Sequence, residues 1–141
     1  MRVSNSLTWK QLEKRWRQGF DTLMREEKEA IALWWLEAET MNGALNQFYW
    51  NSSGDMALLA RDGLRSLDMP IILAALESTL AYFGDTYPLD RDARMAALEV
   101  IEAQHGEEVF LPASHTIQDL PEDFVQAAME RLAVLYARGM V

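Results

Sequence analysis

The chain has 141 residues, half of them hydrophobic and a quarter charged, which is the size and composition of one domain that buries a sizeable core. It has no cysteine, so disulfides and thiol chemistry are excluded. No segment approaches the roughly 18 unbroken apolar residues that a membrane span needs, and residues 1–7 lack the basic-then-apolar pattern of a signal sequence. We therefore expect a cytoplasmic protein in which residues 1–141 form a single domain.

The charge is unevenly distributed along the chain. The net charge is −9, but residues 1–28 carry +3 and the remaining 113 residues carry −12. An acidic surface repels the phosphates of nucleic acids and attracts basic proteins. The main body is therefore predicted to bind no nucleic acid directly, and a protein is the expected partner. The alternative is that the acids only keep the chain soluble.

Residues 1–7 are expected to be flexible, and residues 8–25 are expected to form a basic amphipathic helix. Thr8 with Gln11 resembles a capping box, and Gly19 is expected to kink or divide the helix. The apolar stripe consists of Trp9, Leu12, Trp16, Phe20 and Leu23, and the basic ridge beside it of Lys10, Lys14 and Arg17. Such helices sometimes lie on membranes, but packing on the helix's own domain is commoner, so we predict no membrane binding.

Residues 26–40 are predicted to form a second helix and residues 41–50 a third. Trp34 and Trp35 point to different faces of the second helix, so we predict a homodimer through Trp35 or through the first helix. The apolar face of the third helix is Met41, Ala44, Leu45, Phe48 and Tyr49, and its second stripe is Asn42, Asn46 and Trp50. Turn residues 51–54 then lead into a helix that Ser53 or Asp55 is expected to cap.

The rest of the chain alternates helical patterns with turn signals. Helices are predicted over residues 55–66, 70–83, 90–105 and 119–138, the second of them opening on Pro70 and ending at Gly84. The inward positions of the 90–105 helix are Ala93, Ala97, Leu98, Val100 and Ile101. Residues 106–119 have no clean period and are expected to form a loop with a short extended piece at 109–111. These segments predict an all-α, compact, bundle-like domain of about six to seven helices.

No motif in the chain accounts for a reaction on its own. Glu102 and His105 have the Glu-x-x-His spacing of di-iron helices, but the second copy that such a site needs is absent. The chain also lacks a nucleophile elbow, a phosphate-binding loop and a dinucleotide fingerprint. We therefore predict a non-enzymatic protein with no metal and no cofactor, and rank a small hydrolase third among the alternatives. The side chains that would have to converge in its pocket are Asn42, Gln47, Asn51 and Asp55.

Residues 42–55 resemble the motif Asn-Gly-Gly-Phe-x-Gln-Phe-Phe-x-Asn-x-x-Gly-Asp of the bacterial DNA-mimic protein family, most of whose members have no assigned function. The matching positions, which the resemblance makes fold-defining, are Asn42, Gly43, Gln47, Phe48, Asn51, Gly54 and Asp55. Ala44 replaces the second glycine and Leu45 replaces an aromatic residue, and we expect these departures to tighten the local helix. The resemblance extends over residues 26–138. It implies a compact, dimeric, all-helical domain without catalysis, and a characterised member of the family binds a transcription factor in place of DNA.

A DNA mimic needs carboxylates in rows on a rigid surface, because duplex DNA presents about one charge per 1.7 Å of its axis. The first candidate row is Asp92, Glu99, Glu102, Glu107 and Glu108, and the second is Glu122, Asp123 and Glu130. The resemblance thus implies an acidic protein-binding module that regulates a basic DNA-binding protein such as a transcription factor. The alternatives are an immunity-type or structural protein whose partner does not bind DNA, and acidic rows that are only solvated helix faces.

Overall fold

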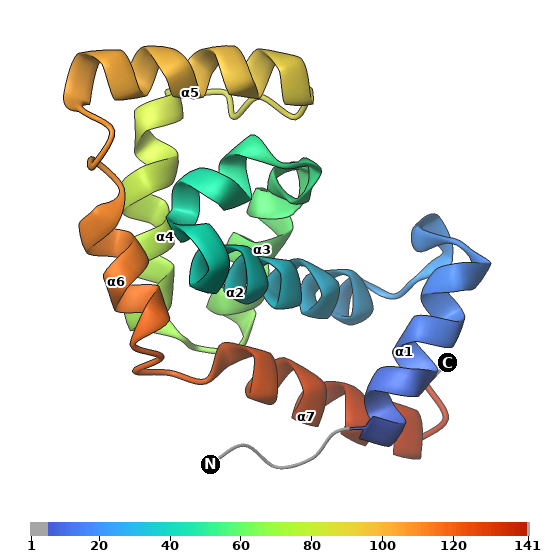
Figure 1. Cartoon of the computed structure of the whole chain (residues 1–141). Coiled ribbons are helices and arrows are strands. Elements are labelled where there is room, and N and C mark those ends of the chain that lie inside the picture. Colours follow the sequence, from blue (N-terminus) through green and yellow to red (C-terminus); the bar gives the residue numbers. More distant parts are fainter. Residues whose placement is uncertain (1–5, 141) are drawn as a thin grey trace.

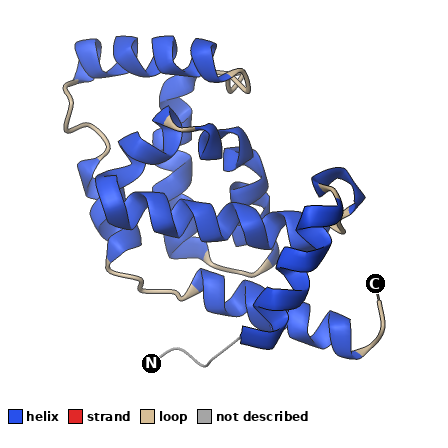
Figure 2. Ribbon diagram, turned by 45° about the vertical axis from the view of Figure 1, so that its right-hand side comes forward, coloured by secondary structure: helices blue, strands red, loops and turns tan. Residues whose placement is uncertain are grey.

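The computed structural model describes residues 6–140, and every regular element in that range is helical (Figure 1, Figure 2). The α-helices are α1 (Ser6–Gln18), α2 (Arg25–Trp50), α3 (Ala57–Ser66), α4 (Pro70–Leu80), α5 (Arg91–His105), α6 (Leu111–Gln118) and α7 (Phe124–Ala137). Three short 3-10 helices connect some of them: η1 (Phe20–Thr22), η2 (Ser52–Met56) and η3 (Ala81–Phe83). The predicted all-α fold is confirmed. Of the segment expected to be flexible, residues 1–5 lie outside the described residues, while Ser6 and Leu7 begin α1.

The longest helix, α2, forms the centre of the fold. Figure 1 shows it in the middle of the molecule, with α5 across the top, α4 and α6 along one side, and α7 below. It contacts α3, α5, α6 and α7, and four consecutive residues, 30–33, are buried. Four consecutive residues point to all sides of a helix, so this part of α2 is surrounded by neighbouring elements. No helix within residues 6–140 is long and apolar enough to cross a membrane.

Several helix ends follow from the local sequence. Gly19 divides α1 from η1, as predicted, and Pro70 occupies the first turn of α4. Asp90 caps α5 by accepting a hydrogen bond from the backbone N–H of Ala93 at 2.9 Å, and Gly106 ends that helix with a φ of 95°. These devices place α5 and fix its direction across the top of the fold.

The expectation that Ala44 tightens its helix is wrong. Gly43 (φ −158°, ψ 32°) and Ala44 (φ 65°, ψ 178°) have non-helical backbone angles and kink α2. The angles of Ala44 lie in a region that glycine adopts easily and other residues do not. At the kink, the N–H of Leu45 donates a hydrogen bond to Ser114 Oγ of α6 at 2.9 Å. The chain therefore turns at Ala44, which replaces the second glycine of the motif that residues 42–55 resemble.

Three other predictions differ from the structure. Residues 109–111 are not extended, because a turn precedes α6, which begins at Leu111. Val100 is 54% exposed and Ala93 is also exposed, because α5 packs on the fold through a narrow face around Leu98. Met41 is 42% exposed rather than part of the core.

The boundaries of two helices also differ from the prediction. Neither Ser53 nor Asp55 caps a helix, since both lie inside η2, and α3 begins only at Ala57. The last helix begins at Phe124, after a turn in which Leu120 has a φ of 47°. Asp123, predicted to lie in a partner-binding row, is the residue that caps α7.

A buried carboxylate joins α1 and α7 to α2. Glu27 is fully buried and accepts hydrogen bonds from Arg15 Nε at 2.6 Å, Tyr136 OH at 2.7 Å and the N–H of Met24 at 2.9 Å. Burial alone raises the pKa of Glu27, but the hydrogen bonds from Arg15, Met24 and Tyr136 outweigh it and hold the pKa below its ordinary value. The carboxylate is therefore charged at neutral pH and stabilises the meeting point of the three helices.

Candidate functional site

The turn that ends the family motif encloses a buried arginine. Arg94 of α5 has no exposed side-chain surface and forms an ion pair with Asp55 at 2.9 Å. It also donates hydrogen bonds to the carbonyl oxygens of Tyr49 at 2.7 Å, Asn51 at 2.9 Å and Pro88 at 3.2 Å. A buried charge is costly unless it is paired and fully hydrogen-bonded, and the guanidinium fork provides the necessary donors. Arg94 thus fixes the end of α2 and all of η2 against α5.

Gly54 of the motif gives the guanidinium its space. A Cβ atom at this position would lie 2.7 Å from Arg94 Nε and 2.9 Å from the carbonyl oxygen of Phe48. The hydroxyl of Tyr87 donates a hydrogen bond to the Gly54 carbonyl at 2.7 Å, and burial raises the pKa of Tyr87, which keeps the hydroxyl protonated. This geometry supports a structural role for the motif residues around the turn.

Two asparagine side chains of the motif segment, residues 42–55, donate hydrogen bonds to carboxylates. Asn51 Nδ2 donates to Glu39 at 2.6 Å, and Asn46 Nδ2 donates to Glu102 of α5 at 2.6 Å. Asn42 is exposed. Of the side chains that a hydrolase pocket would require, only Asn51 and Asp55 line the same cleft.

The acids of the first predicted row separate into two kinds. Asp92, Glu99, Glu107 and Glu108 are exposed, and within residues 6–140 their carboxylates form no hydrogen bond or ion pair. Glu102 is half-buried and accepts the hydrogen bond from Asn46, so it helps to attach α5 to α2. The exposed four are hereafter called the α5 acidic edge.

The acids of the second row contribute hydrogen bonds to the fold. Glu122 Oε1 accepts from the N–H of Ile72 at 2.9 Å and so satisfies a backbone donor in the first turn of α4. Asp123 caps α7, and Glu130 accepts a hydrogen bond from Gln126 Nε2 at 2.9 Å. Of these three acids Glu130 is exposed, whereas Glu122 and Asp123 are half-buried.

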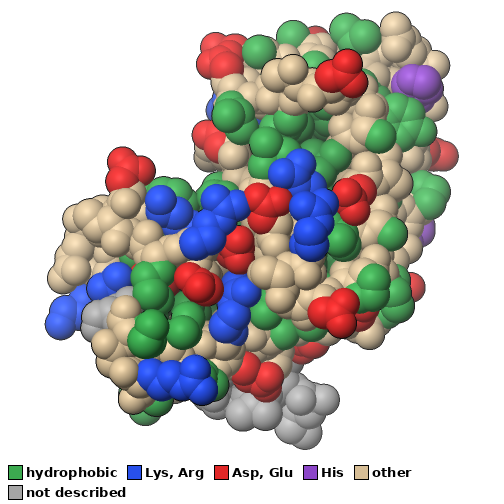
Figure 3. All heavy atoms as spheres, turned by 180° about the vertical axis from the view of Figure 1, so that it is seen from behind, with side chains coloured by type: hydrophobic (Ala, Val, Ile, Leu, Met, Phe, Trp, Pro, Cys, Tyr) green, Lys and Arg blue, Asp and Glu red, His purple; other side chains and the backbone are tan. Residues whose placement is uncertain are grey.

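Basic side chains lie mostly away from α5 and α6. There is no Lys or Arg between Arg94 and Arg131, whereas the same segment contains eight acids. Arg25 and Arg131 form ion pairs with Glu29, which is almost fully buried, and Arg65 forms one with Glu77. In Figure 3 the Lys and Arg side chains lie mainly over the central and lower part of the molecule, among acids. Residues 95–130 thus carry acids without any Lys or Arg, whereas elsewhere the two signs of charge are mixed.

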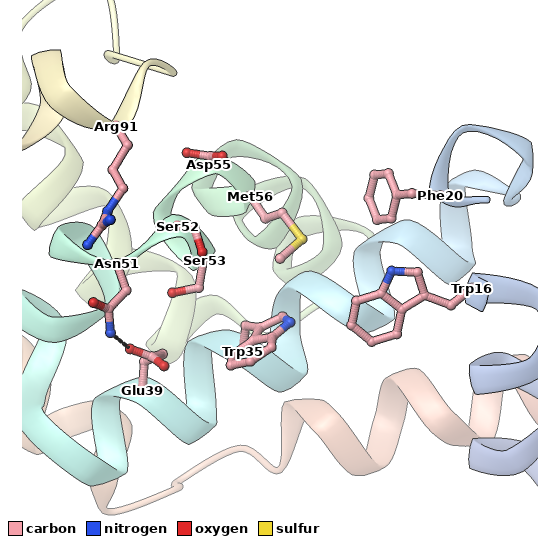
Figure 4. Close-up of a pocket in the computed structure, with 10 residues that line it drawn as sticks. All are labelled: Trp16, Phe20, Trp35, Glu39, Asn51, Ser52, Ser53, Asp55, Met56 and Arg91. Carbon is pink, nitrogen blue, oxygen red and sulfur yellow. Dashed lines mark hydrogen bonds between the residues drawn. The ribbon is translucent and has the colours of Figure 1, made fainter. Parts of the chain in front are cut away.

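A cleft of about 620 Å³ opens between α1, α2 and η2 (Figure 4). Its apolar wall is formed by Trp16, Phe20, Trp35 and Met56, and its polar wall by Glu39, Asn51, Ser52, Ser53, Asp55 and Arg91. Trp35, predicted to form an interface, is half-buried at this cleft. Both motif residues in the polar wall are already bonded to the fold, Asn51 to Glu39 and Asp55 to Arg94.

The two histidines lie on different helices and in different surroundings. The ring of His105 packs edge-on against Tyr82, with the ring centroids 4.9 Å apart, and His115 is exposed on α6. Within residues 6–140 there is no group of three or more His, Asp or Glu side chains that could hold a metal ion.

Sequence reasoning missed Arg94 and the cleft. Arginine is normally a surface residue, and periodicity gives no reason to place one inside. The signal that could have indicated it is the surrounding sequence: Gly54 and Asp55 follow a turn, and Tyr87 and Pro88 precede α5. The cleft depends on how α1 packs, which no local pattern determines.

These features define an all-helical acidic domain with an exposed carboxylate edge and a motif turn closed over a buried arginine. Residues 21–138 match the model of the DMP19-like protein family, where the name stands for DNA mimic protein 19, and the chain belongs to this family. The predicted family resemblance is thereby confirmed. The matched segment contains the motif and both acidic rows, and it leaves α1 outside. No curated protein and no solved structure matches the chain.

Proposed function

We propose that this protein is a non-enzymatic binding module that uses the α5 acidic edge to occupy the DNA-binding surface of a basic protein, such as a transcription factor. Membership of the DMP19-like family supports a DNA-mimic role. The most direct support for this role is the charge of residues 95–130, which include eight acids and no Lys or Arg. A partner that approaches this segment meets negative charge with no compensating cation from the same segment.

The α5 acidic edge has a spacing suited to this role. Asp92 and Glu99 are seven residues apart on one helix, which is about 10 Å along the axis at a rise of about 1.5 Å per residue. Phosphates of one DNA strand repeat about every 3.4 Å of axis, so these two carboxylates are about three nucleotides apart. The capping of α5 by Asp90 and its attachment through Arg94 hold the helix in place, and a rigid row loses little conformational entropy on binding.

The homodimer is a further part of the proposal. Of the two predicted surfaces, Trp35 is half-buried at the cleft, whereas α1 exposes Leu7 to 81%. Leu7 does not line the cleft and is not part of the α5 acidic edge. We therefore favour contact through the first helix.

The partner can be captured from cell lysate on the immobilised full-length chain at low salt and eluted in rising salt steps. We expect one DNA-binding protein to be released steeply with salt and to be displaced by its own DNA site. A partner that resists high salt and has no DNA-binding surface would instead support the rival function, that of an immunity-type or structural interaction protein. In that case the α5 acidic edge would serve solubility.

A further inference from the structure

The cleft beside α1 is part of a longer aromatic groove. A second cavity of about 460 Å³ adjoins it and shares two of its walls, Trp16 and Trp35. The second cavity is also lined by Trp9 and Trp34, so four of the five tryptophans in the chain border the groove, and all four are half-buried. Trp9 and Trp16 come from α1, which lies outside the segment that matches the family. The groove is therefore built jointly by the segment that matches the family and by α1, which lies outside that segment.

The two sides of the main cleft differ in chemistry. Figure 4 shows Trp16, Phe20, Trp35 and Met56 on one side, and the polar side chains, with Arg91 among them, on the other. A volume of about 620 Å³ lies within the usual range of about 300–1,000 Å³ for sites that bind small molecules. An apolar wall facing a few polar groups is the usual form of such a site. The cleft thus suits a small amphiphilic ligand.

The charges of the polar wall decide what kind of ligand fits. Asp55 is already neutralised by its ion pair with Arg94. Glu39 accepts a hydrogen bond from the neutral amide of Asn51, and it has no ion pair within residues 6–140. Arg91 donates its Nε–H to a backbone carbonyl at 3.0 Å, and within the same residues it too has no ion pair. The wall therefore offers one carboxylate and one guanidinium whose charges are not matched inside the protein.

We propose that this cleft binds a small zwitterion with an apolar body, namely an apolar amino acid or a short apolar peptide with free termini. The ammonium group binds Glu39, the carboxylate binds Arg91, and the apolar side chain lies against Trp16 and Trp35. A ligand with only one charge leaves the other protein charge unmatched, and the loss of one hydrogen bond to a charged group weakens binding by about tenfold or more. This site is separate from the α5 acidic edge, and neither Glu39 nor Arg91 belongs to that edge.

The test follows the indole N–H signals of the tryptophans in nitrogen–proton NMR spectra of the full-length chain. Each signal is assigned by a single Trp→Phe substitution. The probes are L-phenylalanine and leucyl-leucine, with phenethylamine and 3-phenylpropionate as analogues that lack one charge. We expect saturable shifts of the Trp16 and Trp35 signals with the zwitterions and binding at least about tenfold weaker with either analogue. Trp50 lines neither cavity and is the internal control. Comparison of L-phenylalanine with leucyl-leucine shows whether an amino acid or a dipeptide binds more tightly. Shifts of the Trp9 and Trp34 signals show whether the ligand reaches the second cavity.

Two charge variants complete the test. Glu39→Gln keeps an acceptor for Asn51, and Arg91→Gln keeps a side-chain donor, so both are expected to fold while weakening zwitterion binding about tenfold or more. Glu99→Gln removes one exposed carboxylate elsewhere on α5 and should leave binding unchanged. The proposal is overturned by three results: no saturation up to about 10 mM of either zwitterion, equal affinity for a single-charge analogue, or unchanged affinity in both charge variants.

Discussion

At the residue scale, Arg94 has the largest predicted effect on stability. It satisfies several carbonyl oxygens of the motif turn and the loop before α5, and its side chain is fully buried. Arg94→Met leaves those carbonyl oxygens without their donor, and buried acceptors left unpaired cost about 1–3 kcal/mol each, so that several together cost about 3–5 kcal/mol. We expect a loss of that size in the free energy of unfolding, measured by urea denaturation. Arg91→Met, which removes an exposed arginine one turn earlier on α5, should cost less than about 1 kcal/mol.

Ala44 provides a prediction of the opposite sign. Its backbone angles cost a non-glycine residue about 1–3 kcal/mol. The greater entropy that glycine gives the unfolded chain lowers the stability by less, about 0.4–1 kcal/mol. Ala44→Gly should therefore raise the free energy of unfolding by about 1 kcal/mol. Ala38→Gly, in the regular part of α2, is the matched control and should lower it by about 1 kcal/mol. If both substitutions destabilise the protein equally, Ala44 is not strained.

At the element scale, the junction of α1, α2 and α7 should make stability depend on pH. Hydrogen bonds hold the pKa of Glu27 in the folded protein below its unfolded value, which is about 4.3. The stability that this carboxylate contributes is therefore present above about pH 4.3 and is lost as the pH falls through the lower, folded pKa. Glu27→Gln should be less stable at pH 7 and should lose less stability between pH 5 and pH 2, roughly the window of that titration.

The control for this prediction is a carboxylate without such contacts. Glu99 is exposed on α5. The variant Glu99→Gln should therefore have a curve of unfolding free energy against pH close to that of the wild type. Thermal unfolding followed by circular dichroism over this pH range distinguishes the two variants. An acid limb of the same slope in Glu27→Gln and in the wild type would mean that other carboxylates govern acid unfolding.

The sequence was sufficient for most elements, because their apolar periodicity and end signals are local. Pro70, Gly84 and Gly106 mark ends that the structure has, and the Leu-rich segments are helices as predicted. The kink at Ala44 could not be predicted from propensity, since alanine is the best helix former and tertiary contacts such as the bond from Leu45 to Ser114 override it. The outward position of Val100 has a similar cause, because the packing of α5 and not its composition decides which face is covered.

The candidate site was harder to predict from the sequence than the fold was. The eight predicted acids were found by counting charge, but their separate roles depend on contacts between distant segments. Glu102 meets Asn46 across 56 residues, and Glu122 meets Ile72 across 50. Only the structure distinguishes such bonded acids from the exposed α5 acidic edge.

At the scale of the whole molecule, the proposed dimer has a direct test. Light scattering at micromolar concentration should give twice the chain mass of 16.1 kDa. Leu7→Glu should shift the mass to that of the monomer if contact is through the first helix, because it places a charge in the proposed interface. Ile71→Glu, at a position on α4 that is 50% exposed, is the control and should remain dimeric. A monomer mass for the wild type would count against the dimer altogether.

The most direct test of the central claim is the affinity of charge-neutralised variants for the captured partner across a range of salt concentrations. The triple variant Glu99→Gln, Glu107→Gln and Glu108→Gln removes three charges from the α5 acidic edge. The matched control removes three exposed acids elsewhere, at Asp21, Asp68 and Asp85. We predict that the first variant binds at least about tenfold more weakly at low salt and with a shallower salt dependence, while the control binds like the wild type. Equal losses in the two variants would contradict the claim, because they would show that net charge matters and the α5 acidic edge does not.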